Sequence, residues 1–221
     1  MAVDLFPLGL SLRVAAVATA LAFVVGVPVA WWLARARFRG RDLVSSLFLL
    51  PMVLPPTVLG YYLLIIIGRR SPLGRAIESI FGDTLVFTPQ AAVLASFVVA
   101  VPFLMRAAQA GFEQVDPIYE EAARTLGRTE LAIFLTVTAP LAWRGIAAGI
   151  ALGFARAVGE FGTTLMVAGN IPGRTQTASI AIYDAVQAGR LDQANALALI
   201  LSAVTGIFLL LLTRLGRAAR W

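Results

Sequence analysis

The chain has 221 residues, of which 59% are hydrophobic and only 14% are charged, and its formal net charge is +6. This composition excludes an ordinary soluble domain, and the lack of His and Cys excludes imidazole or thiol catalysis, disulfides and the common zinc and iron sites. All 18 basic residues are Arg, so the Gly-Lys-Ser/Thr motif of a phosphate-binding loop is missing and any ATP must be bound by another chain.

Apolar runs of about 20 residues recur along the chain, which is the length of helix needed to cross the roughly 30 Å hydrocarbon core of a bilayer. Because open sheets cannot satisfy their backbone hydrogen bonds in lipid, an all-α polytopic membrane protein is predicted, with one transmembrane domain over residues 1–221. In chain order, the five expected spans are Val14–Leu33, Leu43–Ile67, Leu85–Leu104, Gly145–Val167 and Ala194–Leu212.

Arginine and proline positions predict how these spans are oriented and shaped. The basic cluster Arg35–Arg41 follows the first span, and Arg214, Arg217 and Arg220 follow the last, which is typical of cytoplasmic segments. The N-terminus is therefore expected outside and the C-terminus in the cytoplasm, and the arginines are read as orientation signals rather than as a nucleic-acid site. In the second span, the proline-rich stretch 51–56 predicts a kink.

The long connection between the third and fourth spans, about Arg106–Leu141, is the least apolar part of the chain. Asp116 followed by Pro117 is a typical helix start, because Asp can cap the free N–H groups and Pro suits the first helical position. Gly127 stands where a glycine commonly ends a helix. A helix at about Pro117–Leu126 is therefore predicted, although it is too short to be stable alone in water.

This predicted helix has an apolar side and a charged side. They are formed by Ile118, Ala122 and Leu126 and by Glu120, Glu121 and Arg124, respectively. The spacing alone leaves two interpretations open, a loop helix resting on its own membrane domain or a docking helix for a partner protein. In the second case, the small side chains of Ala122 and Ala123 would allow close approach and the acids would meet basic groups.

The stretch EEAARTLGRTELAIFLTVTAP resembles the signature loop of the permease subunits of bacterial ABC importers. That loop reads Glu-Ala-Ala, three residues, Gly, nine residues, Ile-x-Leu-Pro; Val137 and Ala139 replace the usual Ile and Leu. The resemblance implies the type I ABC importer permease fold and a coupling helix seated in a cleft of the ATPase subunit. The ATPase-coupling residues that it implies are Glu120, Glu121, Ala122, Ala123, Arg124, Gly127 and Pro140.

Three further stretches are similar to the molybdate permease subunits of this family. They are FRGRDLVSSLFLLPMVLPPTVLGYYLL, FARAVGEFGTTL and GNIPGRTQT. The resemblance implies a non-enzymatic subunit of the bacterial inner membrane that moves molybdate or tungstate by alternating access. Implied partners are a second copy of the chain, a cytoplasmic ATPase that binds ATP and Mg, and a periplasmic oxyanion-binding protein; no cofactor is expected in this chain. A sulfate or thiosulfate permease is the alternative, and a secondary transporter or a membrane scaffold is a weaker one.

Two features of the fourth span complete the candidate sites. Arg156 and Glu160 lie four residues apart, and ionisable groups at membrane depth must be paired or reach water. They either line an anion pathway or form an ion pair that fixes a bend near Gly159 and Gly162. Small residues at a spacing of four predict close helix packing, against this chain or a second copy; they are Gly145, Gly149 and Gly153.

One polar segment is expected on the outer side, at about Gly169–Gln193. Its polar residues either meet an external binding protein or are simply solvated, and the sequence favours neither interpretation. They are Asn170, Arg174, Thr175, Gln176 and Thr177.

Overall fold

The computed structural model describes residues 4–218, within which every regular element is a helix. The elements are α1 (Phe6–Arg35), α2 (Arg41–Val53), α3 (Pro56–Ile67), α4 (Pro72–Phe81), α5 (Pro89–Glu113), α6 (Pro117–Thr125), α7 (Glu130–Ile133), the π-helix η1 (Phe134–Thr138), α8 (Ala139–Leu141), α9 (Trp143–Val158), α10 (Gly162–Ala168), α11 (Ala178–Gln187) and α12 (Leu191–Ala218). Arg220, assigned above to the C-terminal basic cluster, lies outside the described residues.

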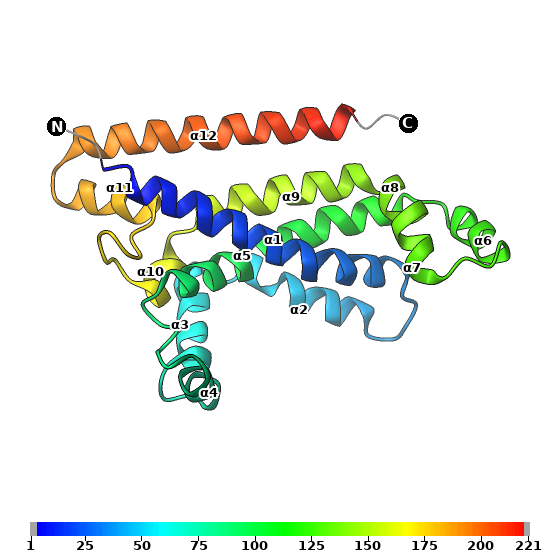
Figure 1. The fold of residues 1–221 in the computed structure, drawn as a ribbon, viewed down its shortest axis with the longest axis horizontal. Helices are drawn as coiled ribbons and strands as arrows, with labels where there is room; N and C mark the ends of the chain where they lie inside the picture. Colours follow the sequence, from blue (N-terminus) through cyan, green and yellow to red (C-terminus); the bar gives the residue numbers. More distant parts are fainter. Residues whose placement is uncertain (1–3, 219–221) are drawn as a thin grey trace.

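The long helices run side by side along the longest axis of the molecule, and α1 begins at the end opposite to the one where α12 finishes (Figure 1). α5 lies in the middle of the core and packs against both α1 and α9. The α1 face toward the core carries alanines, which let helices approach closely where lipid removes most of the hydrophobic driving force. Fully buried members are Ala15, Ala18, Ala22 and Ala30.

The first, third and fifth predicted spans are confirmed as helices long and apolar enough to cross a membrane, namely α1, α5 and α12. Their ends differ from the prediction. α5 begins at Pro89 rather than Leu85, because Thr88 caps it by accepting a hydrogen bond from the Ala91 N–H at 3.2 Å. α5 also continues past Arg106 to Glu113, so the following connection is shorter than expected.

The second predicted span is wrong as a single kinked helix. α2 and α3 meet at an angle of 110° around Leu54 and Pro55, and α3 runs across the bundle axis (Figure 1). The 13 residues of α2 cover about 20 Å at 1.5 Å per residue, which is less than the hydrocarbon thickness. The two helices together could form one broken span.

The fourth predicted span is also two helices rather than one. α9 ends at Val158, and the chain turns before α10 begins at Gly162. The carboxylate of Glu160 accepts a hydrogen bond from the Thr163 N–H at 2.7 Å, so the break has its own cap. At its other end, α9 meets the segment Glu130–Leu141 at 76°. Counting each bent pair as one crossing gives up to five spans.

The connections contain helices that the sequence did not predict. α4 begins after Ser71, whose hydroxyl accepts a hydrogen bond from the Gly74 N–H at 2.7 Å. α11 is tied to α1 because the Ala178 N–H donates to the buried Ser11 hydroxyl at 2.8 Å. Both lie toward the end of the bundle opposite to α6 (Figure 1).

Candidate functional site

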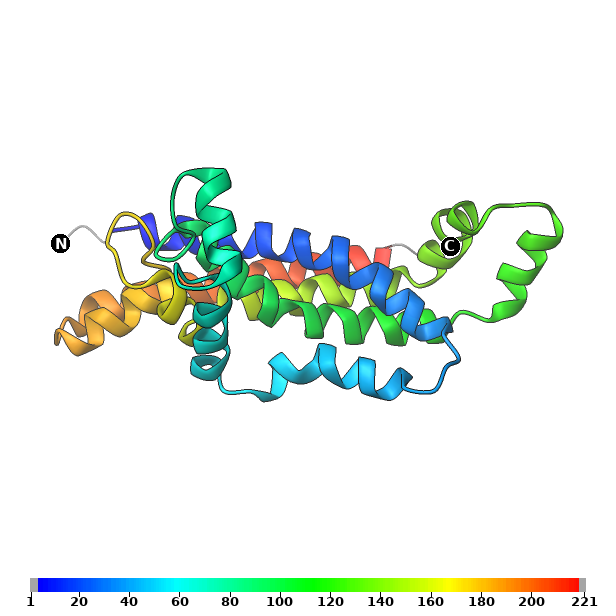
Figure 2. The same ribbon diagram turned by 90° about the horizontal axis from the view of Figure 1, so that it is seen from below.

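The helix α6 stands away from the long helices at one end of the molecule (Figure 2). Its start is fixed as the sequence indicates, since Asp116 Oδ1 accepts a hydrogen bond from the Ile118 N–H at 3.0 Å and Pro117 is the first helical residue. Its end is a Schellman motif. Gly127 has φ +76°, its N–H donates to the Arg124 carbonyl, and the next N–H donates to the Ala123 carbonyl.

In α6, apolar side chains are exposed and one acidic side chain is buried, which is the reverse of an ordinary surface helix. Ile118 is 61% exposed and Leu126 is 81% exposed, whereas Glu120 is only 3% exposed. Glu121 and Ala122 are exposed as well, and Ala123 is buried. The apolar side of this helix therefore does not rest on its own membrane domain and is open to a partner.

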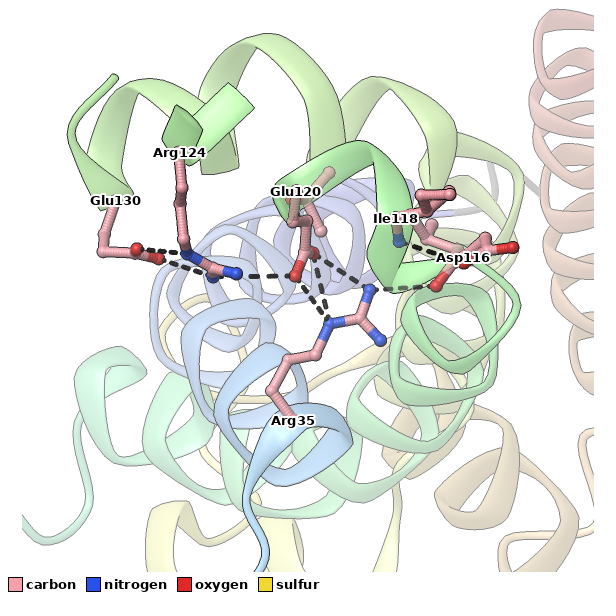
Figure 3. Close-up of polar contacts among 8 residues, drawn as sticks. Arg35, Asp116, Ile118, Glu120, Arg124 and Glu130 are labelled. Carbon is pink, nitrogen blue, oxygen red and sulfur yellow. Dashed lines mark hydrogen bonds and ion pairs between the residues drawn. The ribbon is translucent and has the colours of Figure 1, made fainter. Parts of the chain in front are cut away.

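Glu120 is held by residues from other elements (Figure 3). Arg35, at the end of α1, places its Nε 3.1 Å from both carboxylate oxygens and its Nη2 2.9 Å from Oε1. The same Nη2 donates to the Val115 carbonyl at 3.1 Å, and the Thr138 hydroxyl donates to Glu120 Oε1 at 2.8 Å. The expectation that both acids face a partner is thus wrong for Glu120, which already has partners in this chain.

Arg124 links α6 to the segment that follows it. Its Nε lies 2.6 Å from Glu130 Oε1, and its Nη2 lies 3.9 Å from Glu120 Oε2. The hydrogen bond to the Glu130 carboxylate raises the pKa of Arg124 and lowers the pKa of Glu130. Both side chains are largely exposed, so this pair orients Arg124 more than it stabilises the fold.

Pro140 lies in α8, away from the rest of the signature residues but beside the base of α6. It lines a groove of about 610 Å³ together with Asp116, Tyr119 and Arg144. The π-helix η1 directly precedes α8, and such π-helical turns are frequent at functional sites. Pro140 thus borders the same end of the molecule as α6.

Sequence reasoning missed two residues of this site, Arg35 and Thr138. The sequence indicated only that Arg35 belongs to the basic cluster that orients the first span, and it indicated no role for Thr138. Only the fold brings them to Glu120, which is 85 residues from Arg35 and 18 from Thr138. Among residues 4–218, no group of three or more acidic side chains could hold a metal ion.

Arg156 and Glu160 form an ion pair, with Nη2 and Oε2 2.7 Å apart. Glu160 is 2% exposed and also caps α10, and the hydroxyl of Thr163 donates to the Pro56 carbonyl at 3.1 Å. The pair therefore lies where the break between α9 and α10 meets the break between α2 and α3. The structure thus shows that the two side chains pair with each other, and a place for Arg156 in an anion pathway stays a prediction.

The glycine stripe of α9 faces α5 of the same chain. A Cβ at Gly145 would lie 2.5 Å from the Gly111 Cα, and one at Gly149 would lie 2.6 Å from the Leu104 carbonyl oxygen. At Gly153, the nearest atoms are 3.5 Å away. The stripe thus lets α5 and α9 approach each other most closely at its first two positions.

The polar segment at about Gly169–Gln193 is largely folded on itself. Gln176 donates to Asn170 Oδ1 at 2.8 Å, and Asn170 donates to Asp184 at 3.2 Å. Thr175 and Thr177 are buried. Arg174 differs from these residues, because it is exposed and lines a cavity of about 440 Å³ that also contains Arg69.

The class of protein follows from comparison of this chain with known families. The chain belongs to the family of binding-protein-dependent transport system inner membrane components, which matches residues 26–219. Members of this family are membrane-embedded permeases of ABC importers, and they work with an ATPase and a binding protein.

Within that family, the chain is similar to proteins described as molybdenum transport system permeases. It is 45% identical to a putative one of Bacillus subtilis over 83% of this chain and 81% of that protein. The corresponding permease of Azotobacter vinelandii is 43% identical over 88% of this chain and 86% of its own length. That of Escherichia coli K12 is 42% identical over 96% and 93%.

Solved structures confirm the type of fold. A chain of the inward-facing MetNI methionine ABC transporter has a TM-score of 0.73 at 20% identity, over 97% of this chain and 95% of that one. A chain of a bacterial alginate ABC transporter has a TM-score of 0.75 at 15% identity, over 97% and 79%. The all-helical fold is therefore that of type I ABC importer permeases.

Proposed function

We propose that this chain is the permease subunit of an ATP-driven importer of molybdate or its analogue tungstate, and that α6 attaches the ATPase subunit. Two copies form the pathway in the bacterial inner membrane, a periplasmic binding protein delivers the oxyanion, and the ATPase binds ATP and Mg. In this arrangement the α6 end of the bundle is cytoplasmic and the N-terminus is outside. The relatives described as molybdenum transport permeases support the choice of substrate.

The observation that carries the proposal is the exposed apolar side of α6. Ile118 and Leu126 are exposed, whereas the Glu120 carboxylate is buried. The helix α6 itself lies at the end of the bundle (Figure 2). Exposed apolar surface rimmed by polar residues is typical of a protein interface. The helix-in-groove mode of recognition uses this spacing of apolar side chains along a helix.

The substrate is tested with the reconstituted complex of permease, ATPase and binding protein. ATP hydrolysis is measured with molybdate, tungstate, sulfate or thiosulfate as the only oxyanion. We expect molybdate and tungstate to stimulate hydrolysis. Stimulation only by sulfate or thiosulfate would instead favour a sulfate or thiosulfate permease. If the chain purifies from its native membrane without any ATPase subunit, a secondary transporter or a scaffold is favoured.

The docking role of α6 is tested by Glu121→Lys and by Gly127→Val. The first reverses an exposed charge on α6, and the second places a β-branched residue at φ +76° and disrupts the Schellman end. We expect each to lower co-purification of the ATPase or its stimulation by substrate. The matched control is Glu78→Lys, the same charge reversal on α4 near the other end of the bundle. Normal transport and normal ATPase stimulation in both α6 variants would contradict the docking role.

A further inference from the structure

The side chain of Glu120 connects α6 to α1 and η1, and its partner Arg35 also reaches the connection before α6. Glu120 belongs to α6, Arg35 is the last residue of α1, and Thr138 is the last residue of η1. Val115 lies in the short connection between α5 and α6. The guanidinium of Arg35 contacts the Glu120 carboxylate (Figure 3) and also the Val115 carbonyl.

Burial makes this cluster sensitive to the loss of any member. The Glu120 side chain is 3% exposed and that of Arg35 is 23% exposed. A carboxylate removed from water is costly unless charged or polar groups pair with it, so Glu120 depends on Arg35 and Thr138. The bidentate hydrogen bonding between the guanidinium and the carboxylate also fixes the orientation of the two side chains, which a single point charge would not do.

The position of α6 gives the cluster a mechanical consequence. α6 stands off from the bundle and presents its apolar side outward, whereas α1 packs along α5 and α9 (Figure 2). A partner that moves α6 therefore pulls directly on the end of α1 through Arg35. The hydroxyl of Thr138 extends the same connection to η1, which leads into α8 and α9.

We propose that Arg35 is a positioning residue that ties the docking helix α6 to α1, so that movement of the attached ATPase reaches the transmembrane bundle through the Arg35–Glu120 pair. This inference rests on the proposed function, because it requires an ATPase on α6. Arg35 contacts neither the transported anion nor the ATPase in this account; it acts through Glu120.

A second arginine near the same end of the bundle provides a matched control. Arg41 Nη2 lies 2.8 Å from Glu113 Oε1, but both side chains are substantially exposed, at 36% and 45%. This pair connects α2 to α5 and does not involve α6. Its removal changes the charge as removal of Arg35 does, without breaking the connection to the docking helix.

The test compares wild type, Arg35→Gln, Arg35→Lys and Arg41→Gln, each as the complex with its ATPase and binding protein in proteoliposomes. The readout is molybdate transported per ATP hydrolysed, with the amount of bound ATPase subunit measured in parallel. We expect Arg35→Gln to retain the ATPase and to hydrolyse ATP, with the ratio lowered about tenfold, a typical size for coupling between sites. The ratio for Arg35→Lys should lie between those of wild type and Arg35→Gln, because an ammonium group pairs with the Glu120 carboxylate but cannot form the bidentate hydrogen bonds of a guanidinium.

Arg41→Gln should leave the ratio within about twofold of wild type, as expected for an exposed ion pair. A wild-type ratio in Arg35→Gln, or an equal loss in Arg41→Gln, would overturn the inference. If the Arg35→Gln complex fails to assemble, the Arg35→Lys complex is used instead. A wild-type ratio of molybdate transported to ATP hydrolysed in Arg35→Lys would overturn the inference, and a lowered ratio with a normal amount of bound ATPase would support it. The wild-type complex distinguishes failure of the proposed function from failure of the role assigned to Arg35. Absence of ATP-driven molybdate uptake by the wild-type complex would refute the proposed function itself.

Discussion

The packing of α9 against α5 allows a prediction that compares two identical substitutions in one helix. In Gly149→Ala, the new methyl group would lie 2.6 Å from the Leu104 carbonyl oxygen, well inside the roughly 3.3–3.6 Å of a carbon–oxygen contact. In Gly153→Ala, the nearest atoms are 3.5 Å away, which is an ordinary contact. Because the first obstacle is backbone, the two helices must separate to accommodate the methyl group.

The expected free energies have opposite signs. Replacing a helical Gly by Ala stabilises a helix by about 1 kcal/mol, and this gain applies at both positions. Overpacking costs about 1–3 kcal/mol, and it applies only at Gly149. The difference between the two variants is therefore about 2 kcal/mol, or roughly 4–8 °C in Tm for a protein of this size.

The assay is thermal unfolding of the purified protein in detergent, followed by tryptophan fluorescence. Gly149→Ala should melt below wild type, and Gly153→Ala should melt at or slightly above it. A Gly149→Ala variant that melts at or above the temperature of Gly153→Ala would contradict this prediction. That result would mean that α5 and α9 are not held at the separation that the structure shows.

Two further substitutions test local features of the fold. Asp116→Ala removes the cap of α6, at a cost of about 1 kcal/mol, so hydrogen–deuterium exchange at the start of this helix should accelerate roughly fivefold; unchanged exchange would argue against the cap. Ser11→Ala leaves the buried Ala178 N–H without its acceptor and should destabilise the protein by about 1–3 kcal/mol; an unaltered Tm would show that α11 is not tied to α1 in this way.

The start and end of α6 could be predicted from the sequence because both depend on neighbouring residues. Asp116 and Pro117 satisfy the first N–H groups, and Gly127 supplies the left-handed residue at the end. The burial of Glu120 could not be predicted in the same way. Its partner Arg35 is 85 residues away, so the spacing within α6 placed Glu120 on the solvated side.

The same distinction between local and long-range causes explains the errors in the membrane spans. The proline-rich stretch 51–56 predicted a kink within one helix, but the chain instead breaks into two helices at 110°, because the direction of α3 depends on its packing against α10. A bend near Gly159 and Gly162 was one of the two interpretations of the Arg156–Glu160 pair, but the sequence did not predict that α9 ends at Val158 and that a separate helix begins at Gly162. Glu160 fixes that break through a hydrogen bond to Thr163.

The attachment of the ATPase to α6 can be measured directly, because the chain contains no Cys. A single cysteine is introduced as Leu126→Cys at the C-cap of α6 or, as the control, as Phe81→Cys at the end of α4; the native side chains are 81% and 78% exposed. Maleimide labelling is then compared before and after the ATPase subunit is removed from the complex. We predict that the bound ATPase protects Leu126→Cys and leaves Phe81→Cys fully reactive. Equal labelling of Leu126→Cys with and without the ATPase would show that the ATPase does not cover α6.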